Sequence, residues 1–180
     1  MLALVAGPKL DVILRLVGEL TGVPGAMAEC GVYQGGALKA LADACPDRTV
    51  YGFDTFEGLP AEAWTEGEIH GVGDFRDTSV EAVSAGLADN PNVRLMPGLF
   101  PSTARDLEGE RFALVHLDFD FYASTRDAIA WFLPRLSPGG VLVFDDVDWK
   151  HCPGVRRAVD EAGLAIELTA PCQGVYRHPA

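Results

Sequence analysis

The chain has 180 residues, of which 48% are hydrophobic and 22% are charged, as in an ordinary globular protein with one core. Its formal net charge is −12, from 14 basic and 26 acidic side chains, without any run of Lys or Arg. This balance argues against nucleic acid or an anionic membrane as the main partner. We expect one domain over residues 1–180 and a small-molecule partner, with assembly into a homo-oligomer left open.

The first twenty residues are apolar, but they lack a basic leader and are interrupted by Gly7 and Pro8. No apolar segment approaches the roughly 20 residues that a membrane span requires. The four cysteines do not show the CxxC spacing of a zinc site or the density of a disulfide framework. The sequence therefore predicts neither a signal peptide nor a membrane anchor, reduced cysteines and a cytoplasmic location.

Helical and strand patterns alternate along the chain. Apolar residues at helical spacing predict a helix over 9–21, which Gly22 and Pro24 end, and the apolar run 26–30 predicts a buried strand. Further helices are predicted over 36–45, 79–88, 102–107, 124–136 (with Ser124 as N-cap) and 153–163. Further strands are predicted over 49–54, 92–98, 112–118, 139–146, 164–170 and 174–178.

Almost continuously apolar strands that alternate with helices indicate a mostly parallel sheet with helices on both faces. The turn between the last two strands is too short for a parallel crossover, so the terminal strand should run antiparallel. Residues 55–78 are rich in Gly, Glu and Trp and form a connection long for a compact domain. Long loops of this kind are often lids, and we predict a lid here.

A glycine-rich turn, AECGVYQGG over residues 28–36, follows the first strand, where parallel sheets bind their ligands. A pyrophosphate-binding turn would have the pattern G-x-G-x-x-G, and here Tyr33 stands in place of its second glycine. Asp54 ends the second strand, and a carboxylate there can accept hydrogen bonds from both ribose hydroxyls. Because Glu29 adds a second acid, the turn favours a cationic nucleoside such as S-adenosylmethionine. The structural alternative is that the glycines only allow close packing of strand and helix.

Acidic residues also follow two later strands. Asp118 and Asp120 end one of them, and Asp145 and Asp146 end the next. These strands should be neighbours, so their carboxylates should converge and repel one another unless a cation intervenes. An all-oxygen cluster suits Mg²⁺, with Mn²⁺ or Ca²⁺ as alternatives. Any single one of these residues would more often only cap a turn.

Six sequence strings, in this order, resemble the macrocin/mycinamicin-type O-methyltransferases over residues 26–178. They are AECGVYQGGA, VYGFDTFEGLP, GDFRDTS, GLFPST, HLDFDFYAST and PGGVLVFDDVDW. The resemblance implies the class I methyltransferase (Rossmann-like) sheet, with seven strands and an antiparallel last strand. It also implies a metal-dependent enzyme that uses S-adenosylmethionine to methylate sugar or phenolic hydroxyls of secondary metabolites, as in antibiotic biosynthesis.

The resemblance further assigns roles to matching positions. Residues implied to bind the cofactor are Glu29, Gly31 and Gly35 on its methionine side, Asp54, Thr55 and Phe56 at the ribose, Gly98, Leu99 and Phe100 at the adenine, and also Tyr33 of the glycine turn. Residues implied to hold Mg²⁺ are Asp118, Asp145 and Asp146. Asp120 matches the family's general base.

Two other functions remain as alternatives. A nicotinamide-dependent oxidoreductase would have the same sheet, but the G-x-G-x-x-G pattern is missing and a carboxylate cluster is not needed. A non-catalytic cofactor-binding protein would also have no use for acids at three strand ends. The acid set therefore favours an O-methyltransferase in which the metal acidifies a hydroxyl and Asp120 removes its proton.

Overall fold

We describe the protein from a computed structural model that covers residue 5 and residues 7–180. Residues 1–4 and 6, which include the beginning of the apolar N-terminal segment, lie outside the described residues. Within the described part, no helix has the length and apolar character needed to cross a membrane.

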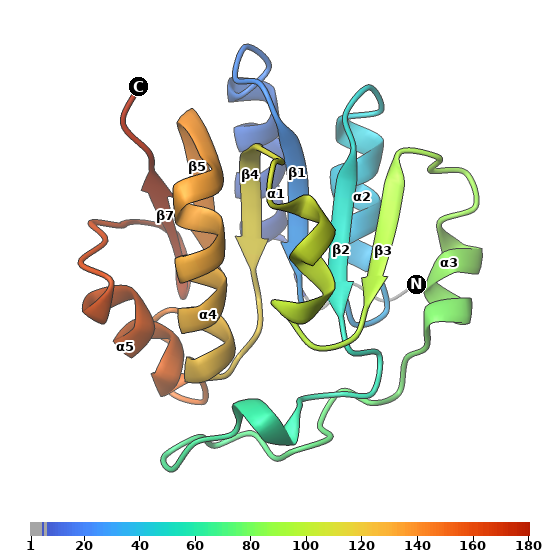
Figure 1. The fold of residues 1–180 in the computed structure, drawn as a ribbon. Coiled ribbons are helices and arrows are strands. Elements are labelled where there is room, and N and C mark those ends of the chain that lie inside the picture. The colour runs from blue at the N-terminus through green and yellow to red at the C-terminus, as the bar shows by residue number, and fades with distance from the viewer. Residues whose placement is uncertain (1–4, 6) are drawn as a thin grey trace.

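A seven-stranded sheet forms the centre of the molecule, with the strand order β3-β2-β1-β4-β5-β7-β6 (Figure 1). The strands are β1 (Ala26–Cys30), β2 (Val50–Asp54), β3 (Val93–Pro97), β4 (Phe112–Leu117), β5 (Leu136–Phe144), β6 (Glu167–Ala170) and β7 (Gln173–Arg177). Pairings among β1 to β5 are parallel, and β7 is antiparallel to both β5 and β6. The predicted sheet, including its antiparallel last strand, is confirmed.

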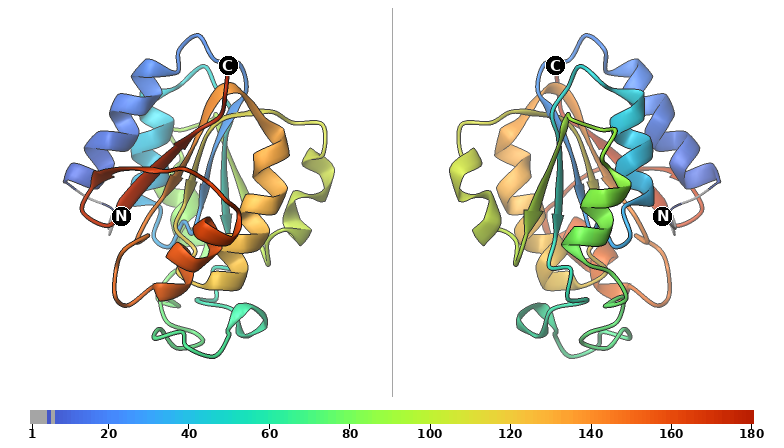
Figure 2. Two further views of the ribbon diagram at one scale, coloured as in Figure 1. Left: turned by 90° about the vertical axis from the view of Figure 1, so that its left-hand side faces the viewer. Right: turned by 90° about the vertical axis from the view of Figure 1, so that its right-hand side faces the viewer.

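Helices cover both faces of this sheet (Figure 2). They are α1 (Pro8–Glu19), α2 (Gly36–Ala44), α3 (Val80–Gly86), α4 (Tyr122–Phe132) and α5 (Pro153–Glu161), with 3₁₀ helices at Ala61–Ala63, Ser102–Leu107 and Leu133–Arg135. One core cluster joins α1, α2 and α3 to the sheet, and a second cluster joins α4 and α5 to the opposite face. The strands are therefore buried on both sides, as their continuous apolar runs require.

The alternating direction of side chains along β1 and β4 determines the face of the sheet on which Glu29 and His116 lie. Met27 and Leu114 point into the core beneath α1 and α2. Because side chains alternate between the faces of a strand, Glu29 and His116 lie in the same layer, two residues farther along β1 and β4. These two residues are also paired across the parallel strands. The ends of β1 and β4 thus present polar groups on the face that α1 covers.

The start of α4 differs from the prediction. The helix begins at Tyr122 with Phe121 as N-cap, so Ser124 lies inside it and does not cap it. In the described part of the chain, the Tyr122 N–H is instead bound by the Glu68 carboxylate, at 2.8 Å. The sequence rule failed because the acceptor comes from a segment 54 residues away and not from the residue before the helix.

The boundary between α4 and β5 also lies earlier than predicted. The α-helix ends at Phe132, and Pro134, which lacks an N–H donor, lies in a 3₁₀ turn. β5 then starts at Leu136 and not at 139, because Leu136 already pairs with Phe112 of β4 before a register shift. Tertiary pairing therefore extends the strand across Pro138, which the sequence pattern reads as a boundary.

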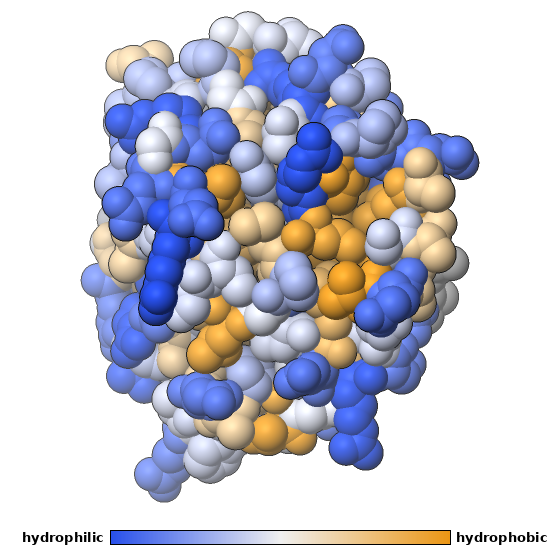
Figure 3. All heavy atoms as spheres, turned by 45° about the vertical axis from the view of Figure 1, so that its right-hand side comes forward, coloured by the Kyte–Doolittle hydropathy of each residue, from blue (hydrophilic) through white to orange (hydrophobic). Residues whose placement is uncertain are grey.

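The segment 55–78 lies across the carboxyl ends of the parallel strands (Figure 1). Hydrophilic residues cover much of the face shown in Figure 3, with hydrophobic patches among them. Several large apolar side chains are exposed in and near this segment: Trp64, Ile69, Val72, Leu99 and Trp149. The carboxyl edge of the sheet is therefore covered by a connection that is itself only partly buried.

Candidate active site

A cavity of about 690 Å³ lies at the carboxyl edge of the sheet. Every residue predicted for the cofactor, the metal or catalysis lines it, except Gly35 and Phe56. Gly35 is the N-cap of α2 in a left-handed conformation, and Phe56 is buried in the core, where only its backbone N–H turns toward Asp54. The structure thus brings together groups from the ends of the five parallel strands, β1 to β5.

Gly31 is required by the packing of the strands. Its φ is +90°, and a Cβ at this position would lie 1.9 Å from the backbone oxygen of Asp118. A side chain here would therefore push the end of β1 away from the end of β4. This observation supports the structural alternative for Gly31 itself, although the residue also lines the cavity.

The Asp54 carboxylate is held at the cavity wall by two backbone donors. Tyr33 N–H donates to Oδ2 at 2.8 Å, and Phe56 N–H donates to Oδ1 at 2.7 Å. A carboxylate has about four lone-pair positions, so each oxygen can accept another hydrogen bond. The two donors fix the orientation of Asp54 and leave acceptors for a ligand diol.

Glu29 and His116 form a buried pair beneath the cavity. His116 Nδ1 lies 3.1 Å from Glu29 Oε1, and the two side chains are 1% and 2% exposed. Burial raises the pKa of Glu29, and the interaction with His116 opposes that rise. Glu29 Oε2 and His116 Nε2 have no hydrogen-bond partner among the described residues. An orphaned carboxylate oxygen on a cavity-lining residue is suited to accept a bond from a cationic ligand.

The strand-end acids form two overlapping groups that could hold a metal ion. Ligand atoms of Asp118, Asp120 and Asp146 lie within 4.8 Å of one another, and so do those of His116, Asp118 and Asp145. Burial raises the pKa of Asp118 well above its ordinary value, and the neighbouring acids raise it further. Burial also raises the pKa of Asp146. Asp118 belongs to both sets, and the raised pKa values show that ionised carboxylates are unfavourable in this cluster.

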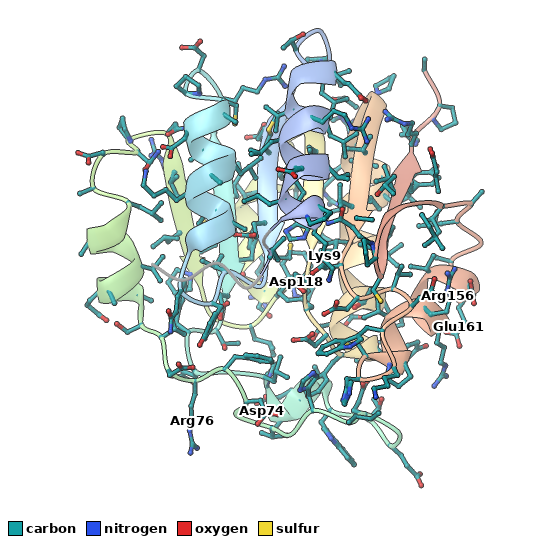
Figure 4. All side chains as sticks on the ribbon, turned by 180° about the vertical axis from the view of Figure 1, so that it is seen from behind. Lys9, Asp74, Arg76, Asp118, Arg156 and Glu161 are labelled. Atoms are coloured by element: carbon teal, nitrogen blue, oxygen red, sulfur yellow. The ribbon has the colours of Figure 1, made fainter. Side chains whose placement is uncertain are left out.

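Lys9 of α1 also reaches this cluster, which the sequence did not indicate. Its Nζ donates to Asp145 Oδ2 at 2.9 Å and to Asp146 Oδ1 at 2.6 Å. Burial alone would lower the pKa of the Lys9 ammonium, but the bonds to Asp146 and Asp145 outweigh it, so the pKa is raised. Figure 4 labels Lys9, in the first turn of α1, and Asp118, and both residues line the cavity. No local pattern could have found this contact, because 136 residues separate Lys9 from Asp145.

Asp120, the predicted base, lies in the cavity wall just beyond β4. The Cys152 thiol donates to its Oδ1 at 3.2 Å. Burial raises the pKa of Asp120 to about 6, while the Cys152 hydrogen bond and nearby His70 oppose that rise. A carboxyl group with a pKa near 6 is ionised at neutral pH and is a stronger base than an ordinary aspartate.

Left-handed backbone conformations are concentrated around the cavity. Of the six non-glycine residues with positive φ in the described part of the chain, all but Phe56 line it: Tyr33, Phe75, Asp120, Asp146 and Cys172. Such conformations are unfavourable and persist only where the surrounding structure imposes them. Their concentration is typical of a functional site.

The predicted lid is bonded to the glycine turn at its C-terminal end. Near its start, Thr55 Oγ1 donates to the Gly58 carbonyl at 2.7 Å. Near its end, the Tyr33 hydroxyl donates to the two Asp77 carboxylate oxygens at 2.9 and 2.8 Å, and the Thr78 hydroxyl donates to the Tyr33 carbonyl. The contacts of Asp77 and Thr78 fix the end of the segment to the glycine turn, whereas the Thr55 bond closes a turn within the segment.

The middle of the segment packs over the acid cluster. The His70 ring lies 5.4 Å from the Phe75 ring and 5.7 Å from the Trp149 ring, between centroids. All three residues line the cavity. Asp74 lies in the same segment, and Arg76 points away from the body of the molecule (Figure 4). The three rings form one wall of the cavity, and a ring nitrogen of His70 lies within 4.8 Å of an oxygen of Asp120.

This arrangement can bind a cationic nucleoside and a hard cation side by side. Asp54 and Glu29 offer acceptors on one side of the cavity, and Asp118, Asp145 and Asp146 offer oxygen ligands on the other. Asp120 lies on the acid side, where it can remove a proton from a bound group. The geometry therefore suits transfer of a group to a hydroxyl oxygen.

Comparison with known proteins agrees with this geometry. The family profile described as Macrocin-O-methyltransferase (TylF) matches residues 9–178. The mycinamicin III 3''-O-methyltransferase of Micromonospora griseorubida is 36% identical, over 86% of this chain and 68% of the relative. The demethyldecarbamoylnovobiocin O-methyltransferase of Streptomyces niveus is 34% identical, over 93% of this chain and 72% of the relative.

A third relative matches over a smaller share of its own length. It is the 8-demethyl-8-(2,3-dimethoxy-alpha-L-rhamnosyl)-tetracenomycin-C 4'-O-methyltransferase of Streptomyces olivaceus. It is 38% identical, over 73% of this chain and 56% of the relative.

Solved structures share the fold. The O-methyltransferase NovP superposes with a TM-score of 0.82 at 27% identity, covering 96% of this chain and 80% of NovP. An O-methyltransferase from Bacillus cereus in complex with SAH has a TM-score of 0.66 at 15% identity, covering 96% and 82%. The second likeness shows the fold alone.

Proposed function

The chain belongs to the macrocin O-methyltransferase (TylF) family, and from this premise we propose a divalent-metal-dependent transfer of a methyl group from S-adenosylmethionine to a small-molecule hydroxyl. The observation that carries the proposal is the single cavity in which the orphaned Glu29 oxygen, the Asp54 carboxylate and the strand-end acids meet. The O-methyltransferase activity follows from the family. The donor, the metal and the residue roles are proposals.

The assignment of S-adenosylmethionine as the methyl donor rests on two carboxylates with different roles. Asp54 accepts the ribose hydroxyls with the lone pairs that Tyr33 and Phe56 leave free. Glu29 Oε2 accepts the ammonium of the methionine part, which would satisfy the buried oxygen. Gly98 and Leu99 form the wall next to the adenine. When bound, S-adenosylmethionine supplies an electrophilic methyl group on a cationic sulfur, which an acidic cavity favours.

The assignment of a metal ion rests on the atoms that would ligate it. Asp118, Asp145 and Asp146 offer only oxygen atoms, which suit a hard cation such as Mg²⁺, with Mn²⁺ or Ca²⁺ as alternatives. Burial raises the pKa values of Asp118 and Asp146, and a cation would favour their ionised forms, as the Lys9 ammonium already does at Asp145 and Asp146. Among the described residues, Asp118 lies within 4.8 Å of Asp146 in one group and of Asp145 in another, so the oxygen atoms around Asp118 fit the ion, although the three acids do not form one such group. When bound, it supplies Lewis acidity that makes a hydroxyl nearby easier to ionise.

The chain's own residues then perform the proton transfer and the positioning. Asp120 accepts the proton of the acceptor hydroxyl on its carboxylate, and its pKa of about 6 matches neutral pH. His70, Phe75 and Trp149 hold the acceptor against the acids and limit the access of water. Positioning of the oxygen in line with the methyl group can supply roughly 7–11 kcal/mol of the acceleration.

The acceptor class comes from the charge of the cavity and from the relatives. Clustered carboxylates repel an anionic acceptor unless the metal intervenes, so a neutral hydroxyl compound suits the cavity with or without the ion. The relatives are O-methyltransferases of mycinamicin, a rhamnosyl tetracenomycin and a novobiocin precursor. We propose a hydroxyl on a sugar or on a phenol or diol of a secondary metabolite.

The nicotinamide-dependent oxidoreductase is no longer favoured, because the family carries out methyl transfer. A non-catalytic cofactor-binding protein remains the alternative, and it would bind the cofactor without using the acid cluster. Methyl transfer requires the metal and an acceptor, whereas binding of the cofactor alone requires neither.

The test is calorimetric titration with S-adenosylhomocysteine, with and without Mg²⁺ and with NAD as control. It is followed by methyl-transfer assays with diol, catechol and sugar acceptors in Mg²⁺ or EDTA. Micromolar binding of S-adenosylhomocysteine, no binding of NAD and turnover that EDTA abolishes are expected. Cofactor binding without turnover of any acceptor would favour the non-catalytic alternative, and turnover that survives EDTA would remove the metal from the proposal.

A further inference from the structure

The Lys9 ammonium occupies a position between two of the proposed metal ligands. Its Nζ lies 2.9 Å from Asp145 Oδ2 and 2.6 Å from Asp146 Oδ1. The Lys9 side chain is 22% exposed, and those of Asp145 and Asp146 are 4% and 15% exposed. The pair is therefore shielded from water and is not an ordinary surface salt bridge.

Asp145 Oδ2 and Asp146 Oδ1 cannot bind the Lys9 ammonium and a divalent ion strongly at the same time. A cation that binds between Asp118 and Asp146 would lie within a few ångströms of the ammonium, and two positive charges at that distance repel strongly in a buried site. Lysine is suited to leave, because its charge sits at the end of a flexible four-carbon stem. Lys9 of α1 lines the cavity, and so does Val5, which precedes the helix.

We propose that Lys9 is the resident counter-ion of the metal site, and that its ammonium and a divalent cation bind the Asp145 and Asp146 carboxylates in competition. The inference rests on the proposed metal dependence. It assigns Lys9 as the residue that sets the metal affinity and keeps the ligand carboxylates in place before the metal arrives.

The position of Lys9 links the metal to the first turn of α1. Gly7 is the N-cap with φ 56°, Pro8 is the first helical residue, and Lys9 follows directly. When the metal displaces the ammonium, this turn loses its anchor to β5. Because such coupling is reciprocal, anything that holds Lys9 in place weakens metal binding to the same extent.

The first test measures the affinity for Mn²⁺ from the loss of its free electron paramagnetic resonance signal on binding. Lys9→Met keeps the length of the side chain and removes its charge, so Mn²⁺ should bind about tenfold more tightly. That is the change expected if the ion pair is closed in about nine molecules of ten. Lys9→Arg keeps the charge and should stay near the wild-type affinity or bind Mn²⁺ more weakly.

Lys39→Met is the matched control. Lys39 of α2 is ion-paired with Asp43 at 2.9 Å, outside the cavity, so its loss should leave Mn²⁺ binding unchanged. Equal or weaker Mn²⁺ binding by Lys9→Met, with Lys39→Met at the wild-type value, would overturn the competition.

A second test uses the wild-type protein and remains informative if Lys9→Met does not fold. Lysine occurs only at positions 9, 39 and 150. The extent of acetylation of each lysine can be read by peptide mass spectrometry after brief treatment with acetic anhydride. Added Mg²⁺ should raise the labelling of Lys9 several-fold and leave Lys39 and Lys150 unchanged. Unchanged or reduced labelling of Lys9 in Mg²⁺ that is shown to bind would overturn the proposal.

The outcomes separate the two levels of inference. If the wild type and Lys9→Met bind Mn²⁺ equally, the metal-dependent function stands and the competition fails. If neither protein binds Mn²⁺ at millimolar concentration, the metal assignment fails and the competition fails with it. Binding by Lys9→Met alone would support strong competition.

Discussion

The Asp120 carboxyl lies just beyond β4, where burial raises its pKa to about 6 and the Cys152 thiol donates to Oδ1. If it is the general base, Asp120→Asn removes the proton acceptor and keeps the shape of the side chain. We expect turnover to fall by about 10²- to 10⁴-fold, with little change in affinity for S-adenosylhomocysteine. Steady-state kinetics and calorimetry measure the two quantities.

The control for this substitution is Asp148→Asn. Asp148 is 40% exposed and is paired with Arg156 outside the cavity, so its loss should leave turnover unchanged. Because Asp120 also belongs to a possible ligand group, the affinity for Mn²⁺ is measured as well. A large loss of Mn²⁺ affinity in Asp120→Asn would make the residue a ligand, and unchanged turnover would remove it from the mechanism.

Glu29 gives a second prediction for a single residue. Glu29→Gln preserves the shape and the contact with His116 but removes the charge that would accept the cofactor ammonium. Affinity for S-adenosylhomocysteine should fall about 10- to 100-fold, the usual loss for a hydrogen bond to a charged group. Stability should not fall, because an ionised carboxylate is unfavourable in a buried position. Exposed Glu161→Gln is the control, and unchanged affinity in Glu29→Gln would contradict the assignment.

Among the elements, segment 55–78 is docked to α4 through one carboxylate. Glu68 accepts the Tyr122 N–H at 2.8 Å, at the N-terminus of a helix whose own N-cap provides no side-chain acceptor. Glu68→Ala should lower the free energy of unfolding by about 1 kcal/mol, as loss of a helix cap does. It should also increase hydrogen exchange in residues 55–78, because the segment loses its anchor.

The neighbouring Glu66 provides the control for this element. Glu66 is exposed and belongs to the same segment, so Glu66→Ala should change neither stability nor exchange. Chemical denaturation and hydrogen exchange with mass spectrometry measure both effects. If Glu66→Ala and Glu68→Ala behave alike, the segment is not held through Glu68.

For the whole molecule, the net charge of −12 and the buried acids predict how stability depends on pH. Asp120 has a folded-state pKa of about 6, above the ordinary 3.8 of the unfolded chain. Between these values the folded state binds more protons, so the free energy of unfolding falls as pH rises toward 6 and then levels off. In EDTA, Asp120 alone should make the protein about 1 kcal/mol more stable at pH 5.5 than at pH 7.5.

Urea unfolding of the wild type and Asp120→Asn at both pH values isolates this contribution. The variant should lose about 1 kcal/mol of the pH dependence, because its side chain does not titrate. The dependence should shrink in Mg²⁺, which neutralises the cluster. Equal pH dependence in the two proteins would show that Asp120 does not titrate near 6.

Local sequence patterns predict much of this fold. Apolar runs of strand length gave the parallel strands, and the short final turn gave the antiparallel last strand, because burial on two faces leaves a continuous apolar signal. Acids at strand ends, such as Asp54 and Asp118, could be assigned to one edge, because parallel strands all end on the same side of a sheet.

The amino-acid sequence by itself determined the sheet, the edge at which the site lies and the residue types that line it. Only the tertiary structure decided that Glu68 binds the start of α4, that Phe56 is core and that Lys9 bonds Asp145 and Asp146. The physical reason is the separation along the chain of the residues that interact. Periodicity and turn chemistry act over a few residues, whereas these contacts form only when packing brings together segments far apart in the chain.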